Sequence, residues 1–77
     1  NLGWLNYEKG EYIEARKWLE LSVSADEMRA DSSCLLALTL LQIGSASSDI
    51  NISCLSLAAP SNQPEIEEWK KELISRL

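Results

Sequence analysis

The sequence predicts an all-α fold of about five helices, arranged as antiparallel helix pairs stacked into a short solenoid. Apolar residues recur at steps of three and four in several stretches, which is the spacing of one helix face. A longer repeat is also present, because Leu2-Gly3 followed by Gly10 recurs 34 residues later as Leu36-Ala37 followed by Gly44. This period is typical of paired-helix repeats. The 77 residues allow one small domain with a limited core.

The first two helices are predicted on either side of Gly10. Residues 2 to 9 form the first, and Gly10 ends it because glycine readily adopts the left-handed backbone conformation found at helix ends. The second begins at Tyr12. Its opposite face is charged, and Glu14 and Lys17 are expected to form a weak ion pair. Apolar or small residues at helical spacing form its inner face: Tyr12, Ala15, Trp18, Leu19, Ser22 and Val23.

A third helix is predicted to begin at a cap provided by Asp31, Ser32 or Ser33 and to end at Gly44. Its apolar residues surround the helix instead of forming one stripe, so it must be covered on more than one side. Either it is a buried central helix, or one side forms an apolar groove for a partner. These apolar residues are Leu35, Leu36, Leu38, Leu40, Leu41 and Ile43.

Residues 50 to 59 are predicted to form a fourth helix, capped by Ser48 or Asp49. Ile50, Ile52 and Cys54 alternate with polar residues as they would in a strand, and β-branched residues favour strands. The 34-residue repeat nevertheless indicates a helix, because it aligns this stretch with the second helix of the first pair.

Pro60 and Pro64 separate the fourth helix from a fifth, for which Asn62 is available as a cap. Ion pairs are expected from Glu67 to Lys71 and from Glu72 to Arg76. One apolar stripe opposite a highly charged face is typical of a helix that closes a stack. The stripe consists of Ile66, Trp69, Leu73, Ile74 and Leu77.

At these positions the chain resembles the tetratricopeptide repeat (TPR) family. In the first repeat Leu2-Gly3 fits the Leu-Gly pair of the family pattern, Gly10-Glu11-Tyr12 fits the turn between helices, and Ala15 and Leu19 fit the small and large apolar positions. Asn6 and Glu27 replace the usual aromatic and proline. The second repeat matches less well, because Asp49 occupies the small position. The resemblance implies one domain: a first repeat over about residues 1 to 27, a second over about 28 to 61 and a capping helix over about 62 to 77.

The resemblance also implies where a partner binds, because the first helix of each TPR pair lines the concave surface. The alternative for each of these residues is core packing. An apolar surface of this kind suits a peptide, a helix or another protein. Self-association through the same helices and a longer repeat array are the alternatives. The candidate partner-binding residues are Trp4, Tyr7, Glu8, Leu35, Leu38, Leu41 and Gln42.

Composition disfavours several other classes of function. A net charge of −5 repels phosphate backbones, so nucleic-acid binding is not expected. The chain has no histidine, and it contains no glycine-rich phosphate loop or nucleophile-elbow pattern, so we expect neither an enzyme nor a bound metal or cofactor. The longest nearly apolar run, residues 34 to 41, is too short to span a membrane. The cytoplasm is the default location.

Two cysteines, Cys34 and Cys54, lie in otherwise apolar helical stretches. We interpret them as buried free thiols, because two cysteines do not make the dense framework of a small secreted protein. A disulfide stays open as an alternative, since bridging depends on the distance between the two Cα atoms.

Overall fold

The computed structural model describes residues 2–26, 30–45, 47–57 and 63–76. These ranges form five helices and no strand, which confirms the all-α class and the expected number of helices. The fourth segment is helical despite its strand-like alternation. The helices are α1 (Leu2–Glu8), α2 (Tyr12–Ala25), α3 (Ala30–Gln42), α4 (Ser48–Leu57) and α5 (Pro64–Arg76).

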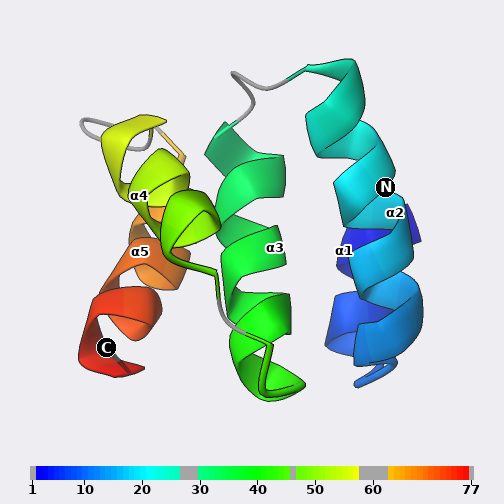
Figure 1. Ribbon diagram of the computed structural model, residues 1–77. Helices are drawn as coiled ribbons and strands as arrows, with labels where there is room; N and C mark the ends of the chain where they lie inside the picture. The colour runs from blue at the N-terminus through cyan, green and yellow to red at the C-terminus, as the bar shows by residue number, and fades with distance from the viewer. Residues whose placement is uncertain (1, 27–29, 46, 58–62, 77) are drawn as a thin grey trace.

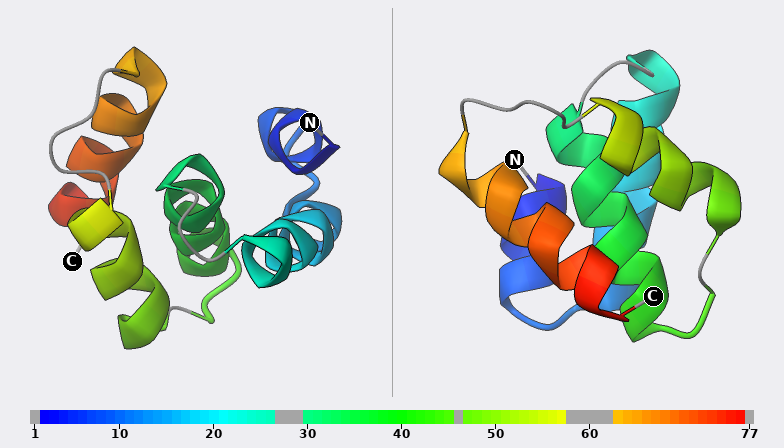
Figure 2. Two further views of the ribbon diagram at one scale, coloured as in Figure 1. Left: turned by 90° about the horizontal axis from the view of Figure 1, so that it is seen from above. Right: turned by 90° about the vertical axis from the view of Figure 1, so that its left-hand side faces the viewer.

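Helix α3 lies at the centre of the molecule. Helices α1 and α2 lie on one side of it and α4 and α5 on the other (Figure 1). Seen from above, α1 and α5 lie toward one face of the molecule, and α2 and α4 lie toward the opposite face (Figure 2). It packs against α2, α4 and α5, whereas α1 packs mainly against α2. Nine consecutive residues of α3, from Ser32 to Leu40, are buried. This agrees with the expectation that a helix with apolar residues all round is covered on more than one side.

Two core clusters lie on different sides of α3. The first contains residues of α3, α4 and α5: Cys34, Ala37, Leu38, Cys54, Ile66 and Leu73. The second contains residues of α2 and α3: Ala15, Leu19, Leu35, Leu36 and Leu40. Helix α3 therefore contributes to both clusters and joins α2 to α4 and α5.

Both predicted glycine ends have the expected geometry. Gly10 and Gly44 have φ angles of 81° and 75°. The Glu11 amide donates to the Asn6 carbonyl at 2.9 Å, and the Gly10 amide donates to the Tyr7 carbonyl at 3.0 Å. These two bonds form a Schellman motif, which satisfies carbonyl groups that a helix end leaves unpaired. The same pair of bonds ends α3, from Ser45 to Leu40 and from Gly44 to Leu41.

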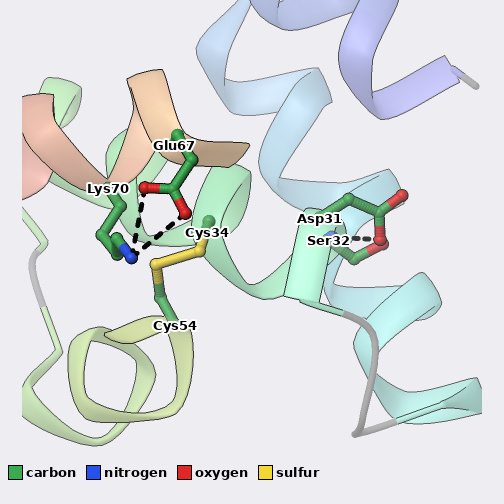
Figure 3. The surroundings of a disulfide bond; sticks show 6 residues. All are labelled: Asp31, Ser32, Cys34, Cys54, Glu67 and Lys70. Carbon is green, nitrogen blue, oxygen red and sulfur yellow. Dashed lines mark hydrogen bonds and ion pairs between the residues drawn. A yellow bond between two sulfur atoms is a disulfide. The ribbon is translucent and has the colours of Figure 1, made fainter. Parts of the chain in front are cut away.

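The interpretation of the cysteines as free thiols is wrong in this structure. Cys34 and Cys54 form a disulfide with their Cα atoms 4.6 Å apart. The bond joins α3 to α4, close to the ion pair between Glu67 and Lys70 of α5 (Figure 3). Both cysteines are fully buried. Sequence could not decide this, because the approach of the two helices is a tertiary property.

Helix α3 begins one residue before the predicted caps. It starts at Ala30, so Asp31, Ser32 and Ser33 lie within its first turn. The Ser32 amide donates to the Asp31 carboxylate at 2.8 Å, and the Ser32 hydroxyl lies 2.7 Å from that of Ser22 on α2. Asp31 therefore accepts a hydrogen bond within α3, and Ser32 links α3 to α2. Asn62, the proposed cap of α5, lies outside the described residues.

The predicted ion pairs are confirmed in two cases of three. Glu14 pairs with Lys17 at 3.5 Å and Glu72 with Arg76 at 3.0 Å. Glu67, however, pairs with Lys70 at 3.3 Å instead of with Lys71. Spacings of three and four residues both bring side chains together on a helix, so sequence does not distinguish these two partners.

Two apolar residues assigned to inner helix faces are exposed. Trp18 of α2 is 41% exposed and Ile74 of α5 is 57% exposed. Both lie at the margin of a predicted stripe, where a small rotation of the helix moves a side chain to solvent. Leu77, the last member of the α5 stripe, lies outside the described residues.

Ala15→Leu is expected to destabilise the protein by about 1 to 3 kcal/mol, because a larger side chain forces a well-packed core apart. Ala15 is fully buried in the cluster shared by α2 and α3. Urea unfolding followed by circular dichroism measures the change. Ala25→Leu is the matched control, since Ala25 is exposed at the end of the same helix. Equal stability of the two variants would contradict the packing of Ala15.

Candidate interaction surface

The residues predicted to bind a partner separate into buried and accessible groups. Leu35 and Leu38 are 2% and 0% exposed and belong to the two core clusters. In this conformation they pack in the core and are not accessible to a partner. Of the other candidates, Glu8 is exposed, whereas the rest are half-buried: Trp4, Tyr7, Leu41 and Gln42.

The accessible candidates lie on α1 and α3, and α5 lies on the same side of the molecule (Figure 2). We call this surface the α1–α3–α5 face. It combines accessible candidates with residues of α5 that contact or pair with them. It consists of Trp4, Tyr7, Glu8, Leu41, Gln42, Trp69, Glu72 and Arg76.

A pair of tryptophans joins the two outer helices of this face. The rings of Trp4 and Trp69 meet edge to face with their centres 5.1 Å apart. The Trp4 indole nitrogen donates a hydrogen bond to the Glu8 carboxylate at 2.8 Å, which fixes one ring. The space beside the two indoles, above Leu35, is about 10 Å³, the size of one water molecule. The indoles themselves therefore form the apolar surface here.

A polar cluster continues the face beyond the tryptophans. Arg76 pairs with Glu72 at 3.0 Å. With the Gln42 amide oriented so that its oxygen faces Arg76, that oxygen accepts a hydrogen bond from Arg76 Nη1 at 3.0 Å. Tyr7 also shares a side-chain hydrogen bond with Gln42. Side chains of α1, α3 and α5 thus meet in one hydrogen-bonded group.

The Tyr7 hydroxyl is neutral at neutral pH, as that of an ordinary tyrosine is, and its surroundings raise its pKa further. Burial raises its pKa, and the nearby carboxylate of Glu72 adds to this effect, whereas the hydrogen bond with Gln42 and the charge of Arg76 oppose it. The net result is a pKa above the ordinary tyrosine value. A neutral phenol can both donate and accept a hydrogen bond, so Tyr7 is able to recognise a polar group at neutral pH.

Sequence reasoning missed the residues that α5 contributes. Trp69, Glu72 and Arg76 lie on a helix that the sequence predicts to close the stack, so the predicted binding residues do not include them. The signal was available in the repeat itself. A partial third unit begins with α5, and the first helix of every TPR-like pair is expected on the same surface.

Comparison with models of protein families, with curated proteins and with solved structures gave no significant match. The described structure thus defines a class and not a family: a small five-helix, all-α module. Within the described ranges no helix is long and apolar enough to cross a membrane. The same ranges contain no group of three or more acidic or cysteine side chains arranged to hold a metal ion.

Proposed function

We propose that this protein is a non-catalytic, TPR-like interaction module that binds a peptide, a helix or another protein through the α1–α3–α5 face. The observation that carries the proposal is the contact of Trp4 with Trp69 beside the hydrogen-bonded group around Arg76. Tryptophan, tyrosine and arginine are the residue types that most often dominate the energy of protein interfaces. All three occur here on one side of the molecule.

The chemistry of the face suits a partner with an apolar anchor next to a polar group. Such an anchor would pack on the two indoles, which offer large rigid surfaces with few rotatable bonds. Tyr7 and Gln42 would then hydrogen-bond a neighbouring polar side chain or an exposed backbone group. Because Arg76 already pairs with Glu72, a strongly charged partner group is not required.

The TPR-like arrangement is part of the same proposal. Helices α1, α3 and α5 would be the first helices of successive units, and α2 and α4 the second helices. Seen from above, α1 and α5 lie toward one face of the molecule and α2 and α4 toward the other, which is consistent with this assignment (Figure 2). The 34-residue spacing of Gly10 and Gly44, which end two of the first helices, supports it further.

Selection of peptides from a random library on the immobilised protein tests the proposal. Peptides that bind are expected to contain an aromatic or large aliphatic residue, and Trp69→Ala should weaken their binding about tenfold or more. Trp18→Ala is the matched control, because Trp18 lies on α2, away from the face. Equal losses in the two variants, or none in either, would contradict the proposed surface.

A second variant guards against a Trp69→Ala protein that folds poorly. Glu8 is exposed and accepts the hydrogen bond of Trp4. Glu8→Lys should preserve the helical circular dichroism spectrum, because it removes only this surface contact. It should still weaken peptide binding by altering the position of Trp4 and the local charge. A folded Glu8→Lys protein that binds every selected peptide normally would argue against a role for α1.

Self-association is the second candidate function. It is favoured by exposed apolar side chains on the first helix pair: Leu2, Leu5, Ile13 and Leu21, each between 52% and 61% exposed. Sedimentation equilibrium over a wide concentration range separates the two functions. The adaptor function predicts a folded monomer. A dimer that Leu5→Asp converts to monomer would instead indicate an assembly module.

The disulfide bears on where the protein works. The cytoplasm was expected by default, but cytosolic thiol systems keep most cysteines reduced. A bond between Cys34 and Cys54 therefore favours an oxidising compartment. We propose such a compartment for the folded, oxidised form.

A further inference from the structure

A second surface lies on the side of α3 opposite Trp4 and Trp69. Between α2 and α4, which flank α3 there (Figure 1), is an open groove of about 320 Å³. Its floor is formed by Leu36 and Leu40, and Val23 and Ile50 form its two walls. The floor residues belong to the core, so the groove is a recess in the packed structure. Its volume is at the lower end of the range for binding pockets and suits one or two apolar side chains.

The groove has one charged side chain among its described lining residues, and it is acidic. Glu20 lies on its rim, and its exposed carboxylate is 3.4 Å from Arg16 of the same helix. Asp49 is exposed and directly precedes Ile50, but it does not itself line the groove. None of the described lining residues is basic, and neither α3 nor α4 contains a lysine or arginine. A partner that enters this groove therefore meets an apolar floor with the carboxylate of Glu20 on the rim.

We propose that the α2–α4 groove binds a basic amphipathic segment of another protein, inserting an apolar side chain over Leu36 and Leu40. A lysine or arginine of that segment lies on the rim beside Glu20. Complementary charge favours this partner and speeds its association. It disfavours a second copy of this chain, whose net charge is −5. This site is separate from the α1–α3–α5 face, so the protein is able to hold two partners at once.

Methyl NMR of the oxidised protein with a synthetic probe tests the proposal. The probe is an amphipathic helical peptide with leucines on one face and lysines on the other, and its control carries glutamates in place of the lysines. The lysine peptide should shift the methyl signals of Leu36, Leu40 and Ile50. Its affinity should fall as salt is added, because salt screens exposed charges. The glutamate peptide should cause no such shifts.

A matched pair of variants locates the binding. Ser24 is exposed on the groove rim, and Ser56 is exposed on α4 and does not line the groove. Ser24→Arg should weaken binding of the lysine peptide about threefold or more, whereas Ser56→Arg, with the same change of charge, should not. Neither exposed serine supports the core, so both variants should retain the parent's unfolding midpoint.

Three results would overturn the proposal. The first is no methyl shift with the lysine peptide at millimolar concentration. The second is equal binding of the two peptides, which would remove the role of charge. The third is a shift of the groove methyl signals when the protein alone is concentrated, which would assign the groove to a second copy of the chain.

Discussion

Leu38→Asp is expected to destabilise the protein more than any other single substitution considered for its core. Leu38 is fully buried in the cluster that joins α3, α4 and α5. Aspartate there removes apolar packing and places a carboxyl group among apolar side chains, which costs about 4 kcal/mol or more. A domain of this size has a total stability of about 4 to 12 kcal/mol. The substitution therefore removes a large share of it.

Urea unfolding followed by far-ultraviolet circular dichroism measures this loss. Leu21→Asp is the matched control, because Leu21 is 61% exposed on α2. The control should lie within about 1 kcal/mol of the parent, as surface substitutions usually do. A Leu38→Asp protein as stable as the control would show that Leu38 faces solvent, and would restore it as a residue available to a partner.

Loss of the disulfide is expected to destabilise the protein by about 3 kcal/mol. The bond closes a loop between residues 20 positions apart, so it removes many conformations from the unfolded chain. It also fastens α4, which otherwise packs on the core through the partly buried side chains of Ile50 and Leu55. Of the α4 residues whose burial is described, only Asn51 and Cys54 are buried. The fourth helix should therefore loosen first.

Two versions of the experiment distinguish the effect of breaking the disulfide bond from the effect of removing the two sulfur atoms. Reductant should lower the urea midpoint of the parent, and Cys34→Ala combined with Cys54→Ala should lower it in the absence of reductant. Reductant should then have no further effect on the double variant. If the parent, unfolded without reductant, reacts with alkylating agent at both cysteines, the bond is absent and the thiol interpretation holds.

The helices were predictable because their signals are local. The spacing of apolar residues in α2 and the positive φ required at Gly10 and Gly44 depend on short stretches of chain. Helix α4 was harder, because Ile50, Ile52 and Cys54 also fit a strand. There the longer repeat supplied information that local propensity lacked, and the helix is present.

The candidate surface was predictable only in part. Trp4, Tyr7 and Gln42 are accessible, but Leu35 and Leu38 are core residues. Periodicity cannot assign sides to a helix that is apolar all round, because every face gives the same signal. The contact of Trp4 with Trp69 and the disulfide both join segments far apart in sequence. Such contacts depend on how helices stack.

The central claim is that a partner binds on the α1–α3–α5 face, and the indole N–H signals of the three tryptophans test it most directly. A ¹⁵N-labelled sample titrated with a selected peptide reports all three at once. The account predicts that the signals of Trp4 and Trp69 shift together, while that of Trp18 stays in place. A shift of Trp18 alone, or saturated binding that moves none of the three, would contradict it.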